Sequence, residues 1–277
     1  MDMLAEYKRE SKKDERSFKE EKIMFDMTGR VAVVTGGSSG LGVLFGHALA
    51  KQGATVVLLA RREEKLQKVV AEIVEQHGTK AGYYVCDVTD SKRVAEVAEL
   101  IVAEYGKIDI AVNCAGGGNC TWADQLTDEM WHKTMAMNLH SLFYCCREFG
   151  KAMIKNGYGR IINISSMLGS IGMDPAFGKG IAEYAATKGG VNNLTRQLAV
   201  EWARFGITVN AVAPGFFASE VSPVGNEWFD NFLKTKCPMK REGHPGELDS
   251  VVVFLAAEES SYITGQIVGV DGGWTAL

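Results

Sequence analysis

The chain has 277 residues, of which 46% are hydrophobic and 23% charged, and its formal net charge is -4. This composition is typical of a folded globular protein and excludes fibrous and wholly disordered classes. The sequence has no basic block suited to a nucleic-acid backbone and no apolar run long enough to span a membrane, so we expect neither partner.

The first residues and the cysteines indicate the cellular setting. Residues 1–25 carry fourteen charged side chains, seven acidic and seven basic, and lack the apolar core of a secretion signal. We interpret them as a charged extension before a single domain over 26–277; a role in subunit contacts is the alternative. The six cysteines form no C-x-x-C pair, so we expect reduced thiols and a cytoplasmic protein.

From residue 29 onward, short β-branched runs alternate with longer amphipathic stretches. The short runs predict seven strands, at 30–35, 55–60, 83–86, 108–113, 160–165, 208–213 and 266–270. The longer stretches predict helices that end near 52 and then cover 63–76, 91–105, 128–153 and 183–204. This alternation is typical of a single-domain, doubly wound α/β fold of Rossmann type, with a seven-stranded parallel sheet and helices on both faces. Residues 214–245 are predicted to be irregular and to form a substrate lid.

A glycine-rich turn follows the first predicted strand and opens the first helix. Its residues of interest are Gly36, Ser38, Ser39, Gly40, Leu41 and Gly42. Backbone N–H groups at the start of a helix suit a pyrophosphate, and glycine allows the close approach of the chain. We therefore predict a dinucleotide-phosphate site here, although glycines also serve ordinary tight turns.

The end of the second predicted strand indicates which dinucleotide binds. An acidic residue at this place holds the ribose hydroxyls of NAD. Here the sequence reads Ala60-Arg61-Arg62, and two guanidinium groups can hold a 2′-phosphate. The site therefore favours NADP(H) over NAD(H); the alternative is that both arginines are solvated surface charges.

Tyr184 and Lys188 stand four positions apart in a strongly helical pattern, so both side chains project from one helix face. A phenol ionises near pH ~10 and becomes a general acid or base at neutral pH when a neighbouring cation stabilises the phenolate. Lys188 can be that cation. Alone, such a pair is common on protein surfaces.

Further motifs accompany this pair: Asn113-Cys114-Ala115-Gly116 after the fourth strand, Asn138, Ser165-Ser166 after the fifth, and Val270-Asp271-Gly272-Gly273 near the C-terminus. Together with the glycine-rich turn they resemble the short-chain dehydrogenase/reductase family over most of the chain. The resemblance implies an NAD(P)-dependent oxidoreductase, homotetrameric or homodimeric, that moves a hydride between nicotinamide C4 and a secondary alcohol or ketone.

The resemblance implies a catalytic tetrad of Asn138, Ser166, Tyr184 and Lys188. Ser166 would hydrogen-bond the substrate oxygen while Tyr184 passes the proton. Lys188 would stabilise the phenolate and hold the nicotinamide ribose, and Asn138 would position a water that connects Lys188 to solvent. Ser165 is the rival to Ser166, and the alternative for Asn138 is a helix-interior Asn bonded to nearby backbone.

The resemblance also assigns the rest of the cofactor site. Asp87 and Val88 would contact the adenine, with Asp87 bonding its exocyclic amine. The adenosine ribose and cofactor backbone would be lined by Asn113, Ala115 and Gly116. The segment beside the nicotinamide would comprise Pro214, Gly215, Phe216 and Phe217. The chain departs from the family in having Cys114 where a second Asn is usual, a change that a backbone contact should tolerate.

A second departure is the spacing of eighteen positions between Ser166 and Tyr184, which is longer than usual for the family and places an inserted loop within 173–181. This insertion resembles the branch of gluconate 5-dehydrogenases and related sugar-acid and polyol oxidoreductases. We therefore expect a sugar, sugar-acid or polyol substrate. The alternatives are a hydroxysteroid dehydrogenase, a 3-oxoacyl-carrier-protein reductase and, in another class, a dinucleotide-sensing protein without turnover.

Substrate contacts are expected from 117–122, 167–181 and 216–232. In the lid, Trp228, Phe229 and Phe232 either cover an apolar ring system or seat the lid on the body. Lysines that could attract a carboxylate, but that are more often solvated, are Lys179, Lys234 and Lys236. No histidine or cysteine spacing fits a metal site, and the motifs of serine hydrolases and phosphoryl transferases are missing, so we predict no metal and neither of those activities.

Overall fold

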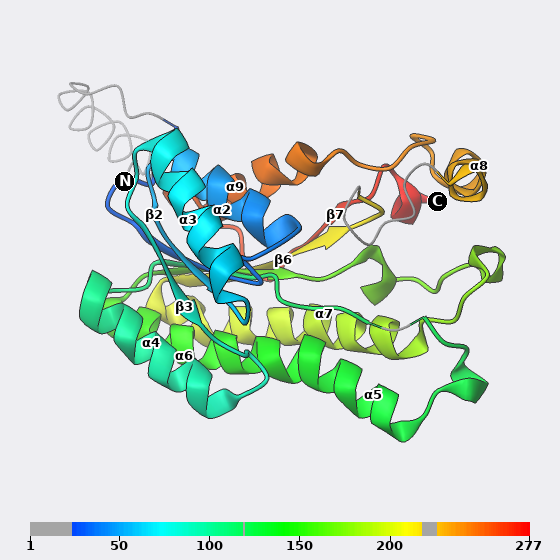
Figure 1. Cartoon of the computed structure of the whole chain (residues 1–277), viewed down its shortest axis with the longest axis horizontal. Helices are drawn as coiled ribbons and strands as arrows, with labels where there is room; N and C mark the ends of the chain where they lie inside the picture. The colour runs from blue at the N-terminus through cyan, green and yellow to red at the C-terminus, as the bar shows by residue number, and fades with distance from the viewer. Residues whose placement is uncertain (1–23, 119, 218–225) are drawn as a thin grey trace, which may run out of the picture.

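A single parallel sheet forms the centre of the computed structural model, which describes residues 24–118, 120–217 and 226–277 (Figure 1). Its seven strands lie in the order β3-β2-β1-β4-β5-β6-β7. They are β1 (Val31–Thr35), β2 (Thr55–Ala60), β3 (Ala81–Val85), β4 (Ile110–Asn113), β5 (Gly159–Ile164), β6 (Ile207–Pro214) and β7 (Ile267–Val270). The predicted seven-stranded doubly wound fold is confirmed. The charged extension expected over 1–25 lies, up to residue 23, outside the described residues.

Helices cover both faces of the sheet, as Figure 1 shows. One face packs against α2 (Leu41–Lys51), α3 (Glu63–His77) and α9 (Asp249–Ala256), and the other against α4 (Ser91–Tyr105), α6 (Ser141–Asn156) and α7 (Ala182–Trp202). Successive side chains of a strand point to opposite faces, so Ala32 and Val34 enter the first core while Val31 and Val33 enter the second. Because both faces are covered, the central strands are buried along their whole length and mostly apolar.

Two helical segments differ from the sequence prediction. The helix predicted over 128–153 is divided into α5 (Asp128–Met135), a π-helical turn η2 (Ala136–His140) and α6. The segment predicted to be irregular over 214–245 contains α8 (Glu227–Lys236), whose first turn is capped by Asn226 Oδ1 accepting from Trp228 N at 3.0 Å. Helix α9 was also not predicted. The amphipathic patterns of α8 and α9 are too short to stand out from a loop.

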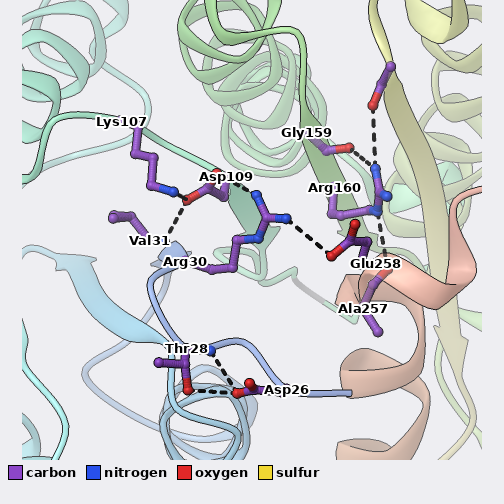
Figure 2. A network of polar contacts seen from close by, with 11 residues as sticks. Asp26, Thr28, Arg30, Val31, Lys107, Asp109, Gly159, Arg160, Ala257 and Glu258 are labelled. Atoms are coloured by element: carbon purple, nitrogen blue, oxygen red, sulfur yellow. Dashed lines mark hydrogen bonds and ion pairs between the residues drawn. The ribbon is translucent and has the colours of Figure 1, made fainter. Parts of the chain in front are cut away.

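A network of charged groups holds the edge of the sheet at which β1, β4 and β5 begin (Figure 2). Asp109, just before β4, accepts from Val31 N at 2.8 Å and lies 3.3 Å from Arg30 and 3.0 Å from Lys107. Arg160 donates to the carbonyl oxygen of Ala257 at 3.2 Å. Buried charges are costly unless paired, and here they are paired, so the network stabilises the amino ends of these strands. The predicted motifs lie at the opposite, carboxyl ends.

Candidate active site

Two cavities of about 390 and about 570 Å³ lie at the carboxyl ends of the strands. The walls of both include Gly36, Ser39 and the backbone over 115–118, so the cavities adjoin. The first is also lined by Arg61, Arg62, Asp87 and Val88, and the second by Ser166, Tyr184, Lys188 and the segment 214–217. An elongated space at this edge of an open α/β sheet is where such folds bind dinucleotides.

The glycine-rich turn after β1 packs closely on the loop after β4. Gly36 has a φ of 73°, and a Cβ there would lie 3.1 Å from Ala115 Cα. Thr35 Oγ1 accepts from the backbone N–H groups of Cys114 and Ala115 at 3.0 and 3.1 Å. Gly42 does not line either cavity, but a Cβ there would collide with Gly36 O. The first turn of α2 carries no acidic residue. The turn therefore fits a pyrophosphate.

The two arginines after β2 lie at the wall of the first cavity. The Arg62 guanidinium donates to Ser39 Oγ at 2.6 Å and to Ser38 Oγ at 3.3 Å, so it is held against the glycine-rich turn. Arg61 lines the same cavity. This placement puts two cations beside the space next to the predicted phosphate cradle.

Asp87, which also lines the first cavity, carries a charge. Burial alone would raise the pKa of Asp87, but hydrogen bonds from the Thr89 backbone and hydroxyl, together with the charge of Arg61, hold that pKa below its ordinary value. The two hydrogen bonds reach Asp87 Oδ1 at 3.0 and 2.7 Å. An ionised carboxylate is a hydrogen-bond acceptor, as an exocyclic amine requires.

Asn113 lies in the interior instead of on the cavity wall. Its Nδ2 donates to Asn163 Oδ1 at 2.9 Å, and Asn163 Nδ2 donates in turn to Thr195 Oγ1 at 3.0 Å. These groups connect β4, β5 and α7, so the Asn113 side chain fixes the loop that follows β4. Sequence reasoning missed Asn163, whose signal was an amide within an apolar strand. Ala115 and Gly116 do line both cavities.

The two serines after β5 have different roles. The Ser165 hydroxyl donates to Asn192 Oδ1 at 2.6 Å and is buried in the core. Ser166 Oγ accepts from Leu168 N at 3.2 Å, which leaves its hydroxyl proton to donate toward the second cavity. The geometry therefore favours Ser166 as the group that would bind a substrate oxygen.

Tyr184 and Lys188 lie in the first two turns of α7 and both line the second cavity. Lys188 Nζ donates to Ile164 O at 2.7 Å and lies 5.5 Å from the centre of the Tyr184 ring. The hydrogen bond to the end of β5 fixes the buried ammonium group beneath the tyrosine. A fixed cation near a phenol stabilises the phenolate.

Asn138 lies in the π-helical turn η2, behind the cavity wall. Its Oδ1 accepts from Gly117 N at 2.8 Å, and its Nδ2 donates to Thr187 Oγ1 at 3.1 Å. A Cβ placed on Gly116 would lie 3.1 Å from Asn138 Oδ1 and 3.7 Å from Lys188 Nζ, so the two side chains are neighbours. Asn138 thus bonds the loop over the site and α7, not the backbone of its own turn. π-helical turns are frequent at functional sites.

Two other residues near the site escaped sequence reasoning. Phe177, from the inserted loop, lines the second cavity and lies 5.6 Å from Phe216, measured between ring centres. Glu183, beside Tyr184, is fully buried, and its carboxylate oxygens have no hydrogen-bond partner within the described residues. Cys114 also lines the second cavity, and burial raises the pKa of its thiol to about 12 against the opposing charge of Lys188, which favours the thiol over the nucleophilic thiolate.

Within residues 24–118, 120–217 and 226–277 no three His, Cys, Asp or Glu side chains are grouped so that they could hold a metal ion. In the same ranges, no helix combines the length and apolarity needed to cross a bilayer.

Residues 36–275 match the family model described as Enoyl-(Acyl carrier protein) reductase. Gluconate 5-dehydrogenase of Gluconobacter oxydans is 37% identical over 254 residues, covering 91% of this chain and 97% of that protein. Galactitol 2-dehydrogenase (L-tagatose-forming) of Cereibacter sphaeroides is 38% identical over 255 residues, with 91% and 97% covered. The crystal structure of a gluconate 5-dehydrogenase from Burkholderia cenocepacia in complex with NADP and tartrate aligns with a TM-score of 0.87 at 35% identity, covering 92% and 98% of the two chains.

These similarities, with the adjoining cavities at the strand ends, define an NAD(P)-dependent oxidoreductase. The chain belongs to the short-chain dehydrogenase/reductase family, and gluconate 5-dehydrogenases are among its relatives. Both the family and the branch that the motifs and the inserted loop resembled are confirmed.

Proposed function

We propose that this enzyme interconverts a secondary alcohol and a ketone of a sugar-related or polyol substrate and prefers NADP(H). The observation that carries the proposal is the second cavity, in which Ser166, Tyr184 and the Lys188 beneath it line one space beside the glycine-rich turn. A proton-transfer set of this kind has no evident use in a protein that only senses dinucleotides.

In the proposed mechanism, the nicotinamide supplies or accepts the hydride at C4 when the cofactor is bound. Ser166 donates its hydroxyl proton to the substrate oxygen and so orients and polarises the reacting carbon. Tyr184 gives a proton to that oxygen during reduction and takes it back during oxidation. Lys188, fixed by Ile164 O at 2.7 Å, would stabilise the phenolate and hold the nicotinamide ribose. Asn138 holds the loop at Gly117 and would position a water that links Lys188 to solvent.

The cofactor preference is supported by the charges around the first cavity. Arg61 and Arg62 line it where an NAD-specific site would place a carboxylate, and Arg62 is already fixed by Ser38 and Ser39. We infer that these two guanidinium groups bind the 2′-phosphate of NADP(H), that the turn from Gly36 to Gly42 holds the pyrophosphate, and that Asp87 and Val88 contact the adenine.

We further propose that the enzyme is a homodimer or homotetramer. An open groove of about 640 Å³ between α6 and α7 is lined in part by Leu139, Phe143, Gly190 and Leu194. Phe143 is 39% exposed and Val200, farther along α7, is 79% exposed. Exposed apolar surface over two neighbouring helices is typical of an interface. The single domain over 26–277, with its lid within 214–245, would be the repeating unit.

The six free cysteines are compatible with a reducing compartment, and we propose a cytoplasmic location.

The substitution Tyr184→Phe tests the mechanism. We expect kcat to fall at least about a hundredfold while the Kd for NADPH changes little, because only the proton-transferring hydroxyl is removed. Turnover would be followed at 340 nm and binding by nicotinamide fluorescence. Tyr262→Phe, at a fully exposed tyrosine, is the matched control. Retained turnover in the Tyr184 variant would remove this residue from the mechanism.

A further inference from the structure

We propose that the substrate is an uncharged alcohol or ketone whose apolar side rests on Phe177, and that carboxylate-bearing analogues are poor substrates. This inference rests on the proposed function and names its substrate class. It separates neutral polyols and sugars from sugar acids, which the motifs alone leave together.

The charge of the second cavity is the first argument. Among the described residues that line it, Lys188 is the one charged side chain. Lys188 is buried, and its Nζ is 2.7 Å from Ile164 O beneath Tyr184. The Lys188 side chain therefore lies beside Tyr184, at the end of the cavity where the substrate would react. A carboxylate elsewhere in the cavity would lose water without gaining a cation, which is unfavourable.

Two cations of the segments that flank the cavity, Lys236 and Arg241, already have acidic partners. Lys236 Nζ lies 2.6 Å from Asp174 Oδ2, and this contact lowers the pKa of the aspartate. Arg241 donates to both carboxylate oxygens of Glu247 at 2.8 Å.

Two further lysines, and the undescribed positions inside the domain, supply no cation to the cavity. Lys179 and Lys234 are exposed and line neither cavity. The undescribed positions inside the domain, 119 and 218–225, contain one charged residue, the acidic Glu220.

Phe177 provides the apolar wall. It comes from the loop inserted between Ser166 and Tyr184, and its ring centre lies 5.6 Å from Phe216, 5.7 Å from Phe232 and 5.9 Å from Trp228. The Asp174–Lys236 ion pair joins the same loop to α8. The ring is thus held from one side by packing and exposes its other parts to the cavity, where it can cover the C–H side of a polyol or sugar.

Hydroxyl groups, by contrast, find partners in this cavity. Ser166 and Tyr184 would bind the reacting oxygen, and the backbone over 116–118 lines the same cavity. Neutral donors and acceptors of this kind can satisfy hydroxyls without a net charge. The cavity therefore combines a polar wall and an aromatic wall, as a neutral polyhydroxy compound requires.

Matched substrate pairs test the inference with the native enzyme. D-gluconate and D-glucitol, D-galactonate and galactitol, and L-threonate and L-threitol each differ by a terminal carboxylate in place of CH₂OH. The assay uses saturating NADP⁺. In each pair that is oxidised, we expect kcat/KM for the neutral member to exceed that for the acid by at least about tenfold, which corresponds to about 1.4 kcal/mol. An equal or higher kcat/KM for the acids would overturn the inference.

Two variants assign the effect to Phe177. Phe177→Ala should lower kcat/KM for the neutral substrate by about tenfold, mostly through KM, because an apolar contact is lost. Phe177→Arg should raise the ratio of acid to neutral kcat/KM by at least about tenfold, because it places a guanidinium in the cavity wall. Tyr262→Ala, at an aromatic residue remote from the site, should leave both values unchanged.

The outcomes separate this inference from the function on which it rests. Oxidation of the acids at least as fast as of the neutral compounds, with turnover lost in Tyr184→Phe, overturns the substrate class and leaves the proposed mechanism standing. Turnover of neither member of any pair, with NADP(H) bound, counts against both. An unaltered preference in Phe177→Arg overturns the role of Phe177.

Discussion

Arg62 is the residue on which the proposed cofactor preference depends most directly. Its guanidinium is held by two serine hydroxyls of the glycine-rich turn, and Arg62→Ala would remove the proposed charge-assisted contact to a 2′-phosphate. We expect the Kd for NADPH to rise about tenfold or more and the Kd for NADH to change less than about threefold.

Fluorescence titrations at fixed ionic strength would measure both constants. Arg204→Ala, which removes a cation from the surface at the far end of α7, is the control. Equal losses of affinity for NADPH and NADH would contradict a phosphate-specific role for Arg62.

Asp249, at the start of α9, makes stability depend on pH. Burial raises its pKa to about 6, against the opposing charge of Lys51, and its Oδ1 has no hydrogen-bond partner within the described residues. Because the folded state binds this proton more tightly than the unfolded state does, the contribution of Asp249 to stability falls as pH rises from about 4 to about 6.

We therefore expect Asp249→Asn to be more stable than the wild type at pH 8, by up to about 1 kcal/mol because solvent screens a half-buried group. The difference should vanish below the ordinary pKa of an aspartate. Urea unfolding at several pH values measures it. A constant difference across the range would mean that the substitution acts through packing or capping instead of through ionisation.

At the scale of elements, the regular strands and helices could be predicted from the sequence, whereas the irregular turn at Asn138 and the long-range contact of Asn113 could not. The seven strands were predicted because short β-branched runs bounded by turn residues are a local signal in the sequence. Tyr184 and Lys188 were found because they belong to one helix, so their spacing in sequence is their spacing in space. The π-helical turn at Asn138 inserts one residue into a continuous amphipathic pattern, and the sequence shows no recognisable signal of this insertion. The interior place of Asn113 depends on Asn163, fifty residues away, which no local pattern contains.

Helix α8 packs through a cluster of its own, in which Phe229, Phe232, Leu233 and Cys237 are buried and separate from the two cores of the sheet. The aromatic residues of the predicted lid therefore seat it on the body. Phe232 lies 5.7 Å from each of Phe177 and Trp274, between ring centres. We expect Phe232→Ala to lower the free energy of local unfolding of this helix by about 3 kcal/mol without unfolding the sheet.

Limited proteolysis would show faster cleavage within 226–245, while the main thermal transition stays within a few degrees of the wild type. Trp228→Ala, at a ring that is 46% exposed, should have a smaller effect on cleavage. If the temperature of the main transition instead drops as the cleavage rate rises, the lid and the sheet unfold together.

On the scale of the whole molecule, two groups of charged residues lie at opposite ends of the parallel strands. At the edge where β1, β4 and β5 begin, Asp109 and its cations pair with each other and with backbone, so their charges stabilise the fold (Figure 2). At the opposite edge, Arg61, Arg62 and Lys188 line the cavities. Parallel strands place their carboxyl ends together, and the functional groups contributed by β1 through β6 converge there for that reason.

The remaining feature at this scale is the apolar groove between α6 and α7, which lies apart from both cavities. If this groove is the interface of a symmetric assembly, Phe143 meets the partner subunit near the centre of the contact, and a charge there would be buried without a partner. We expect the wild type to sediment as a dimer or tetramer at micromolar concentration and Phe143→Asp to shift toward the monomer. Tyr262→Asp, at an exposed turn outside the groove, should keep the wild-type mass. A monomeric wild type would show that the groove serves another purpose, whereas an unaltered assembly of the Phe143 variant would place the interface on another face.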